Sequence, residues 1–207
     1  MRRTPELARQ EILEAAERLY AESYPAQVGL KDVAREAGVS HALVTHYFGT
    51  YAGLVEATLE RRIRALRERV LGKLATTGVL EQPVELLGLL FEALADPVHQ
   101  KLLKWLIASD RTSALQTFAM KDQGMGVIAH KVAHELAPKP SQQMIEILEL
   151  AILTAVSAAY GYMLNKDALT AALGKQPTPA LDEAVRATLA SMLQAHLASR
   201  LGSTIPA

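Results

Sequence analysis

The chain has 207 residues, half of them hydrophobic, and its 22 Lys and Arg balance 22 Asp and Glu to a formal net charge of zero. This balance gives no overall attraction for nucleic acid, so a DNA-binding role must rest on a local motif. The absence of cysteine excludes disulfides, thiolate zinc sites and cysteine nucleophiles. The N-terminus lacks an apolar signal region, and no uninterrupted apolar run reaches the roughly 20 residues of a membrane span, so we expect a cytoplasmic protein.

Abundant Ala and Leu, few aromatic residues and almost no strand-type alternation predict an all-α fold. Thr4 and Pro5 combine a capping hydroxyl with a proline at the first helical position, so a first helix begins there and ends near Pro25. The next three helices are expected at about residues 30–38, 40–48 and 50–71.

The rest of the chain is predicted to form longer helices. Thr178 and Pro179 repeat the helix start of the N-terminus, and Gly202 supplies a stop. Ser141 can cap the long apolar helix that follows Pro140. These helices are expected at residues 83–95, 97–109, 112–137 (with a break at 124–126), 141–164 and 179–201.

Residues 37–40, Ala-Gly-Val-Ser, have the composition of the turn in a helix-turn-helix. Gly38 can adopt the left-handed conformation, and Ser40 can accept an N–H bond at the next helix start. Val44 and Phe48 are four residues apart and should face inward, together with Val39. The outward residues are then His41, Ala42, Thr45 and His46. Their low charge suits a recognition helix in the major groove, and an ordinary helical hairpin is the alternative.

Four segments together carry a family resemblance: ILEAAERLYAE in the first helix, DVAREAGVS through the turn, HYF at the end of the third helix and LVEA in the fourth. With them, residues 6–66 resemble the TetR family of bacterial transcriptional regulators. The resemblance implies an N-terminal three-helix DNA-binding domain over 6–66, with its helix-turn-helix at about 29–48. It also implies a larger helical domain over 67–207 for ligand binding and dimerisation. The expected function is a homodimeric repressor that a small molecule releases from a palindromic operator.

The sequence departs from the family pattern at three places. Val28 and Gly29 replace a usual Thr or Ser pair, SHALVT replaces the common Ser-x-Gly-Thr-Leu-Tyr, and Tyr51 replaces a phosphate-binding Lys. We therefore expect DNA contacts to shift toward histidine, tyrosine, backbone N–H groups and the N-terminal arginines. The residues expected to contact DNA are Arg2, Arg3, Gly29, Lys31, Ser40, His41, Ala42, Leu43, Thr45, His46, Tyr47 and Tyr51.

The helix predicted at 141–164 is apolar on most sides and rich in small residues, so it should be buried on several faces. Paired with 179–201, it fits a four-helix dimer interface, and a monomer core is the alternative. The expected interface residues are Ile152, Ala155, Ala159, Val185, Leu189 and Met192.

An apolar cavity with a few polar groups is the usual form of a ligand site. Core packing is the alternative for each candidate residue, and none of them identifies a ligand. The candidate lining residues are Phe91, Leu103, Trp105, Leu106, Phe118, Met125, Ile128, Tyr160 and Met163.

His130 and His134 share one helix face at a spacing that can chelate a metal, but polar pocket contacts and ordinary surface roles remain alternatives. No glycine-rich phosphate loop or Gly-x-Ser-x-Gly elbow is present, so neither an enzyme nor a cofactor is expected. The alternative functions are a helical ligand-binding or adaptor protein with impaired DNA binding and, least favoured, a helical metal-dependent enzyme.

Overall fold

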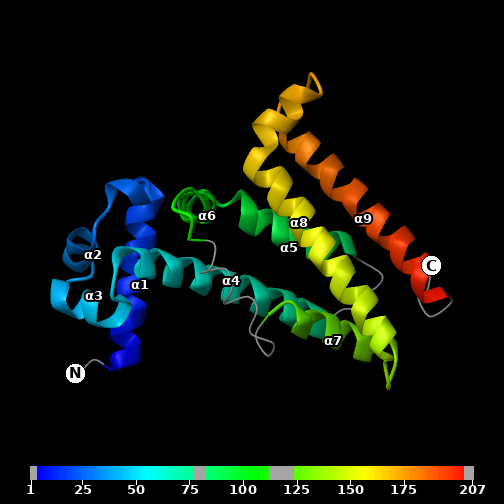
Figure 1. The fold of residues 1–207 in the computed structure, drawn as a ribbon, viewed down its shortest axis with the longest axis horizontal. Coiled ribbons are helices and arrows are strands. Elements are labelled where there is room, and N and C mark those ends of the chain that lie inside the picture. Colours follow the sequence, from blue (N-terminus) through cyan, green and yellow to red (C-terminus); the bar gives the residue numbers. More distant parts are fainter. Residues whose placement is uncertain (1–3, 77–82, 112–123, 203–207) are drawn as a thin grey trace. The chain divides into compact units, whose positions relative to one another are not determined.

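The computed structural model describes residues 4–76, 83–111 and 124–202, which are helical and contain no strand (Figure 1). This confirms the all-α fold class. The elements are α1 (Pro5–Glu22), the 3-10 turn η1 (Pro25–Gln27), α2 (Leu30–Glu36), α3 (His41–Phe48), α4 (Tyr51–Thr76), α5 (Pro83–Ala95), α6 (Pro97–Ala108), α7 (Gly126–Leu136), α8 (Gln142–Ala172) and α9 (Pro179–Leu201).

The helix starts follow from local capping. Thr4, Ser141 and Thr178 each accept a hydrogen bond at 3.2 Å from the backbone N–H three residues later, as the sequence predicts. Gly202 ends α9 with a φ of 63°. Residues 112–123 of the helix predicted at 112–137 lie outside the described residues, and α7 covers most of its remaining part.

α8 continues eight residues beyond its predicted end at Leu164. Asn165 interrupts its regular geometry and donates a side-chain hydrogen bond to the Gly161 carbonyl at 3.1 Å. By length and composition α8 could cross a membrane, with an 18-residue window of mean hydropathy 1.6, although polar residues interrupt every apolar run. The core helix of a globular protein can have the same length and composition, so this property alone is weak support for a membrane span.

The chain forms two compact units. The N-terminal unit comprises residues 4–65 and 96–111 of the described chain, and the C-terminal unit comprises 66–76, 83–95 and 124–202. The chain passes from one unit to the other within α4, between Ala65 and Leu66. The predicted N-terminal domain did not include α6, which packs against α1 and η1.

α6 is attached to the N-terminal unit by polar contacts as well as by buried leucines. Lys101 Nζ donates to the carbonyls of Tyr20 and Ala21 at 3.0 Å each, where the C-terminal end of α1 lacks helical partners. Asp96 caps α6 by accepting from the Val98 and His99 N–H groups. It also pairs with the Arg62 guanidinium of α4 at 2.7 Å.

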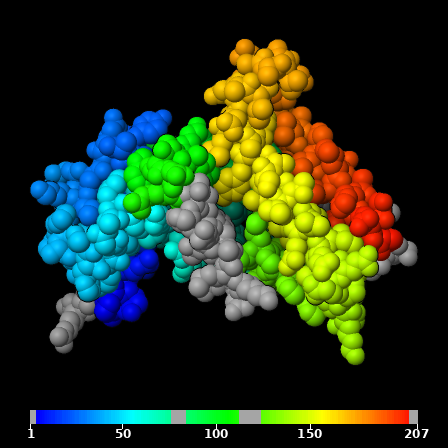
Figure 2. All heavy atoms as spheres, viewed as in Figure 1, coloured from blue at the N-terminus to red at the C-terminus, as the bar shows by residue number. Residues whose placement is uncertain are grey.

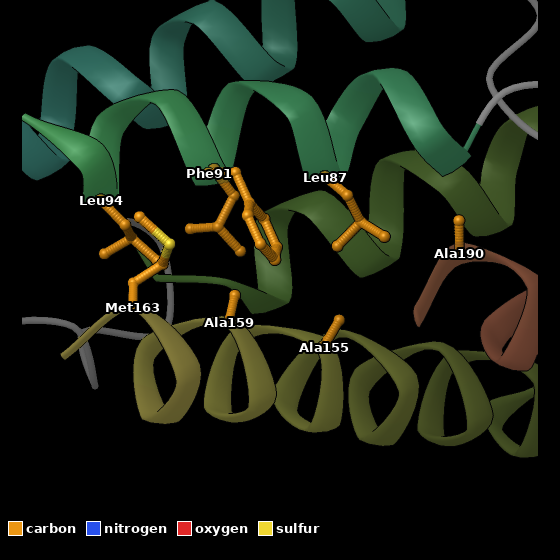
Figure 3. Packing of buried hydrophobic residues seen from close by; sticks show 8 residues of the cluster. Leu87, Phe91, Leu94, Ala155, Ala159, Met163 and Ala190 are labelled. Carbon is orange, nitrogen blue, oxygen red and sulfur yellow. The ribbon is translucent and has the colours of Figure 1, made fainter. Parts of the chain in front are cut away.

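The C-terminal unit packs α5, α8 and α9 around one apolar cluster (Figure 3). Leu87, Phe91 and Leu94 of α5 point toward Ala155, Ala159 and Met163 of α8, and Ala190 of α9 closes the cluster. The small alanines let the helices approach closely. A second cluster joins the end of α4, α7 and the start of α8 through Leu74, Ala129, Ala133, Ile145 and Leu148.

His99 is 2% exposed, and burial, assisted by the nearby Arg62 charge and opposed by Asp96, lowers its pKa to about 4. The unfolded chain binds a proton here below about pH 6.5, whereas the folded chain stays neutral down to about pH 4. His99 therefore stabilises the fold above that range, and this contribution is lost as the pH falls.

We expect acidification from about pH 7 to about pH 5 to destabilise the wild type by about 2 kcal/mol more than it destabilises His99→Gln. Urea unfolding at the two pH values measures the difference. His41→Gln, at an exposed position of the same unit, is the control and should behave as the wild type does. Equal acid sensitivity of His99→Gln and the wild type would contradict the assignment.

Candidate nucleic-acid interface

The turn between α2 and α3 closes as a Schellman motif. Gly38 has a φ of 64°, the Val39 N–H bonds to the Ala34 carbonyl at 2.9 Å, and the Gly38 N–H bonds to the Arg35 carbonyl at 3.2 Å. A residue with a side chain is strained at this φ, so glycine is the residue the turn requires. The predicted helix-turn-helix turn is present.

α3 has one buried and one exposed side, as predicted. Ser40 caps its start by accepting from the Leu43 N–H at 3.2 Å. Val44 and Phe48 are 0% and 9% exposed. The opposite side presents His41, Ala42, Thr45 and His46 to solvent. This side contains no carboxylate that would repel a nucleic-acid backbone.

α2 packs on α1, and ion pairs connect both α2 and α4 to α1 (Figure 1). Arg18 of α1 pairs with Glu36 of α2 at 2.7 Å, and Arg61 of α4 pairs with Glu14 of α1 at 3.0 Å. Because α2 packs directly on α3, these pairs help to hold α3 in a fixed position within the unit.

Two residues predicted to contact DNA make hydrogen bonds within the N-terminal unit. Gly29 donates its N–H to the Asp32 carboxylate at 3.0 Å, so this amide does not point to an external phosphate. Tyr51 donates its hydroxyl to the Pro25 carbonyl, and its ring meets the Trp105 ring edge-on at 5.7 Å. Burial raises the pKa of Tyr51, which keeps the phenol a hydrogen-bond donor. Tyr51 thus joins α4, η1 and α6, and neither Pro25 nor Trp105 is near it in the sequence.

The remaining predicted DNA contacts differ in exposure. Lys31 is exposed in the first turn of α2, whereas Leu43 and Tyr47 are half-buried on α3. The Tyr47 ring meets the exposed His46 ring edge-on at 5.4 Å. Arg2 and Arg3 lie outside the described residues.

Sequence reasoning missed Arg9 of α1. Its guanidinium lies over the Phe48 ring at 5.4 Å from the ring centroid, at the end of α3. Helical periodicity places Arg9 on an exposed face of α1, but only the packing of α1 against α3 brings it to the recognition helix.

The predicted ligand residues belong to separate packing clusters. Leu103 and Leu106 are buried on α6 in the N-terminal unit, where Trp105 contacts Tyr51. The others lie in the C-terminal unit or outside the described residues. Phe91 and Met163 are in the first C-terminal cluster with Tyr160 against it, Ile128 packs on the second cluster, Met125 is half-buried before α7, and Phe118 lies outside the described residues.

The residues predicted for the dimer interface differ in burial. Ala155 and Ala159 are buried against α5 within the protomer, so their side chains are not available to a second copy. Met192 is 65% exposed. The remaining three, Ile152, Val185 and Leu189, are half-buried against the two clusters.

His130 and His134 are both exposed on α7. In the part of the chain that the structure describes, no three His, Cys, Asp or Glu residues form a group that could hold a metal ion.

Tyr51→Phe removes the hydroxyl that donates to the Pro25 carbonyl, which keeps the Val28 N–H as its other donor at 3.2 Å. We expect the loss of this one hydrogen bond to lower the free energy of unfolding by about 0.5–1.5 kcal/mol, measured by urea denaturation. Tyr24→Phe, at an exposed tyrosine of the same unit, should leave stability unchanged. If Tyr51→Phe instead kept full stability and reduced the salt dependence of DNA binding, Tyr51 would be a phosphate contact after all.

The family model described as bacterial regulatory proteins of the tetR family matches residues 12–58. The chain is 40% identical over 73 residues to the HTH-type transcriptional regulator Rv1255c of Mycobacterium tuberculosis, covering 35% of this chain and 36% of that protein. It is 33% identical over 129 residues to the HTH-type transcriptional repressor Rv3405c of the same species, covering 61% and 66%. It is 36% identical over 73 residues to the HTH-type transcriptional regulator BetI of Yersinia pestis, covering 35% and 37%.

The chain spans between about a third and two thirds of the length of these relatives, and each relative is named an HTH-type transcriptional regulator or repressor. The matched family segment runs from the middle of α1 to the first turns of α4 and contains the whole helix-turn-helix. Residues 12–58 therefore carry a segment of the tetR family of bacterial regulatory proteins, and this segment includes the helix-turn-helix.

Proposed function

We propose that the protein is a DNA-binding transcriptional regulator that inserts α3 into the major groove of an operator. The observation that carries the proposal is the two-sided α3, with Val44 and Phe48 buried behind it and an uncharged outer side of His41, Ala42 and Thr45. Ala42 can contact thymine methyl groups, and the Thr45 oxygen can accept from a base amino group.

The name of one relative favours repression over activation. Rv3405c, which shares the longest matched segment among the relatives described above, is named a repressor. A repressor needs only to occupy its operator, which a rigid DNA-binding unit accomplishes without a further contact to polymerase.

We propose that α8 and α9 form a homodimer interface, on the face opposite the one that packs on α5. α8 and α9 lie next to each other (Figure 2), and the exposed residues on this outer face are mostly small or apolar. Its members are Leu150, Leu153, Ser157, Ala158 and Gly161 on α8, and Ala184, Ala187, Thr188, Ser191, Met192 and Ala195 on α9. Successive members lie one, three or four residues apart, so each helix presents them as one stripe. A second copy would cover both stripes in a four-helix interface.

A two-fold dimer would present two copies of α3 to successive major grooves, which lie about 34–36 Å apart. The operator would therefore be palindromic.

We further propose that a small apolar or amphipathic molecule regulates the affinity for DNA. The C-terminal unit connects to the N-terminal unit through α4 itself, and Asp96 alone separates α5 from α6. A ligand that displaces α5 would therefore also displace the start of α6 through the chain connection. A coupling of about 1–3 kcal/mol is enough for regulation.

The second candidate is a helical adaptor or ligand-binding protein that no longer binds DNA tightly. It is favoured by charge: residues 1–65 and 96–115 contain 12 Lys and Arg and 11 Asp and Glu, so almost no net positive charge attracts a DNA backbone. An adaptor of this kind would show no sequence preference for any duplex.

A selection from a random-sequence duplex library, with the purified ligand-free protein at low salt, tests the proposal. We expect enrichment of one palindrome whose half-sites are about one helical turn apart. The double variant His46→Ala and Tyr47→Ala should lose the enrichment, because it removes the contacting pair of rings formed by the exposed His46 and the half-buried Tyr47. If the wild type enriches no sequence, the proposed regulator function is wrong and the adaptor or ligand-binding function is favoured.

Ala158→Arg tests the dimer. Burying an unpaired guanidinium from each subunit costs several kcal/mol, so the dimer dissociation constant should rise about 100-fold or more. Analytical ultracentrifugation should then show a monomer, and gel shifts should show weakened binding to the palindrome. Ala75→Arg, at an exposed alanine of α4, should remain a dimer. A dimer that persists in Ala158→Arg would place the interface elsewhere.

A further inference from the structure

Most cations of the N-terminal unit are already neutralised by carboxylates of the same unit. Six arginines are in ion pairs at 2.7–3.5 Å. These pairs are Arg18–Glu36, Arg35–Asp32, Arg61–Glu14, Arg62–Asp96, Arg64–Glu60 and Arg111–Glu56. An arginine held in this way would have to break its pair before it could bind a phosphate.

Three cations of the described N-terminal unit have no carboxylate partner there: Arg9, Lys31 and Lys104. Lys101 is engaged with the carbonyls at the end of α1. Lys31 begins α2 and Arg9 lies against the end of α3, whereas Lys104 is on α6, which packs on α1 and η1. Two of the three thus lie on helices that adjoin the recognition helix.

Arg9 is also positioned by its contact. Its guanidinium lies over the face of Phe48, and the Phe48, Tyr47 and His46 rings follow one another at centroid distances of 6.3 and 5.4 Å. Stacking leaves the N–H groups at the guanidinium edge free for a bidentate anion. The contact therefore restrains the cation at the C-terminal end of α3 without using its hydrogen bonds.

The dimensions of B-DNA place phosphates at that position. The major groove is about 12 Å wide and a helix with its side chains about 10–12 Å across, so the bordering phosphates lie beside the recognition helix. The C-terminal end of α3 carries the negative end of the helix dipole, which would repel a phosphate there. A fixed guanidinium at this end offsets that repulsion.

We propose that Arg9 is a phosphate-binding residue that anchors the C-terminal end of α3 to the DNA backbone. The inference rests on the proposed DNA-binding function and assigns Arg9 no part in reading base sequence. Phe48 is the positioning residue for its guanidinium.

The test compares Arg9→Gln, Arg9→Lys and Lys104→Gln with the wild type by fluorescence anisotropy. The probes are the duplex selected from the random library and a scrambled duplex of the same length, at about 50 to 200 mM salt. Lys104→Gln removes one exposed, unpaired cation from the same unit, away from α3, and so controls for net charge. Circular dichroism melting verifies that each variant folds.

For Arg9→Gln we expect the slope of log affinity against log salt to become shallower by about 0.9 per bound subunit. Both duplexes should lose affinity by the same factor, because a phosphate contact is independent of sequence. Arg9→Lys should retain the wild-type slope, and Lys104→Gln should change it much less than Arg9→Gln does.

An unchanged slope in a folded Arg9→Gln that still binds the selected duplex would overturn this inference and leave the proposed function intact. Equal effects of Arg9→Gln and Lys104→Gln would also overturn it, because the effect would then be one of net charge. A wild type that binds neither duplex would overturn the proposed function together with this inference.

Discussion

The helix-turn-helix depends on the burial of Val44 and Phe48 behind α3. This one apolar contact decides which side of α3 faces outward, since both residues lie on the same stripe of an eight-residue helix. A helix this short is not stable alone in water, so packing and not propensity determines its conformation. The exposed side of α3, the stacked Arg9 and the turn at Gly38 all take their positions from it.

Ion pairs join the helices of the N-terminal unit and engage most of its described cations. The guanidiniums that join α1, α2 and α4 are exposed enough that each pair contributes little to stability, typically below about 1 kcal/mol. Their larger effect is on charge, because each pair removes a cation from the surface that a phosphate could bind. In the proposed complex, binding would then depend on few cations and on the shape and apolar character of α3.

In the C-terminal unit, α8 packs on α5 and also carries the proposed dimer interface. The inner alanines of α8 let it approach α5 closely, and its outer small residues leave a stripe that a second copy would cover. The composition of α8 therefore predicts close packing on two sides. The composition does not show which small residue lies on which side. Ala155 and Ala159 pack inside the protomer, whereas Ala158 and its neighbours are exposed and form the proposed dimer interface.

Local sequence patterns are enough to predict the helical class, the helix starts at Thr4, Ser141 and Thr178, the turn at Gly38 and the inner side of α3. Each of these depends on residues within a few positions of one another, through capping hydroxyls, a left-handed glycine or helical periodicity. The packing of the folded chain was needed to find that Tyr51 contacts Pro25 and Trp105, that α6 packs with the N-terminal helices, and that Arg9 lies over Phe48. Those contacts join residues 26 to 81 positions apart in the chain, where no local pattern carries information about the partner.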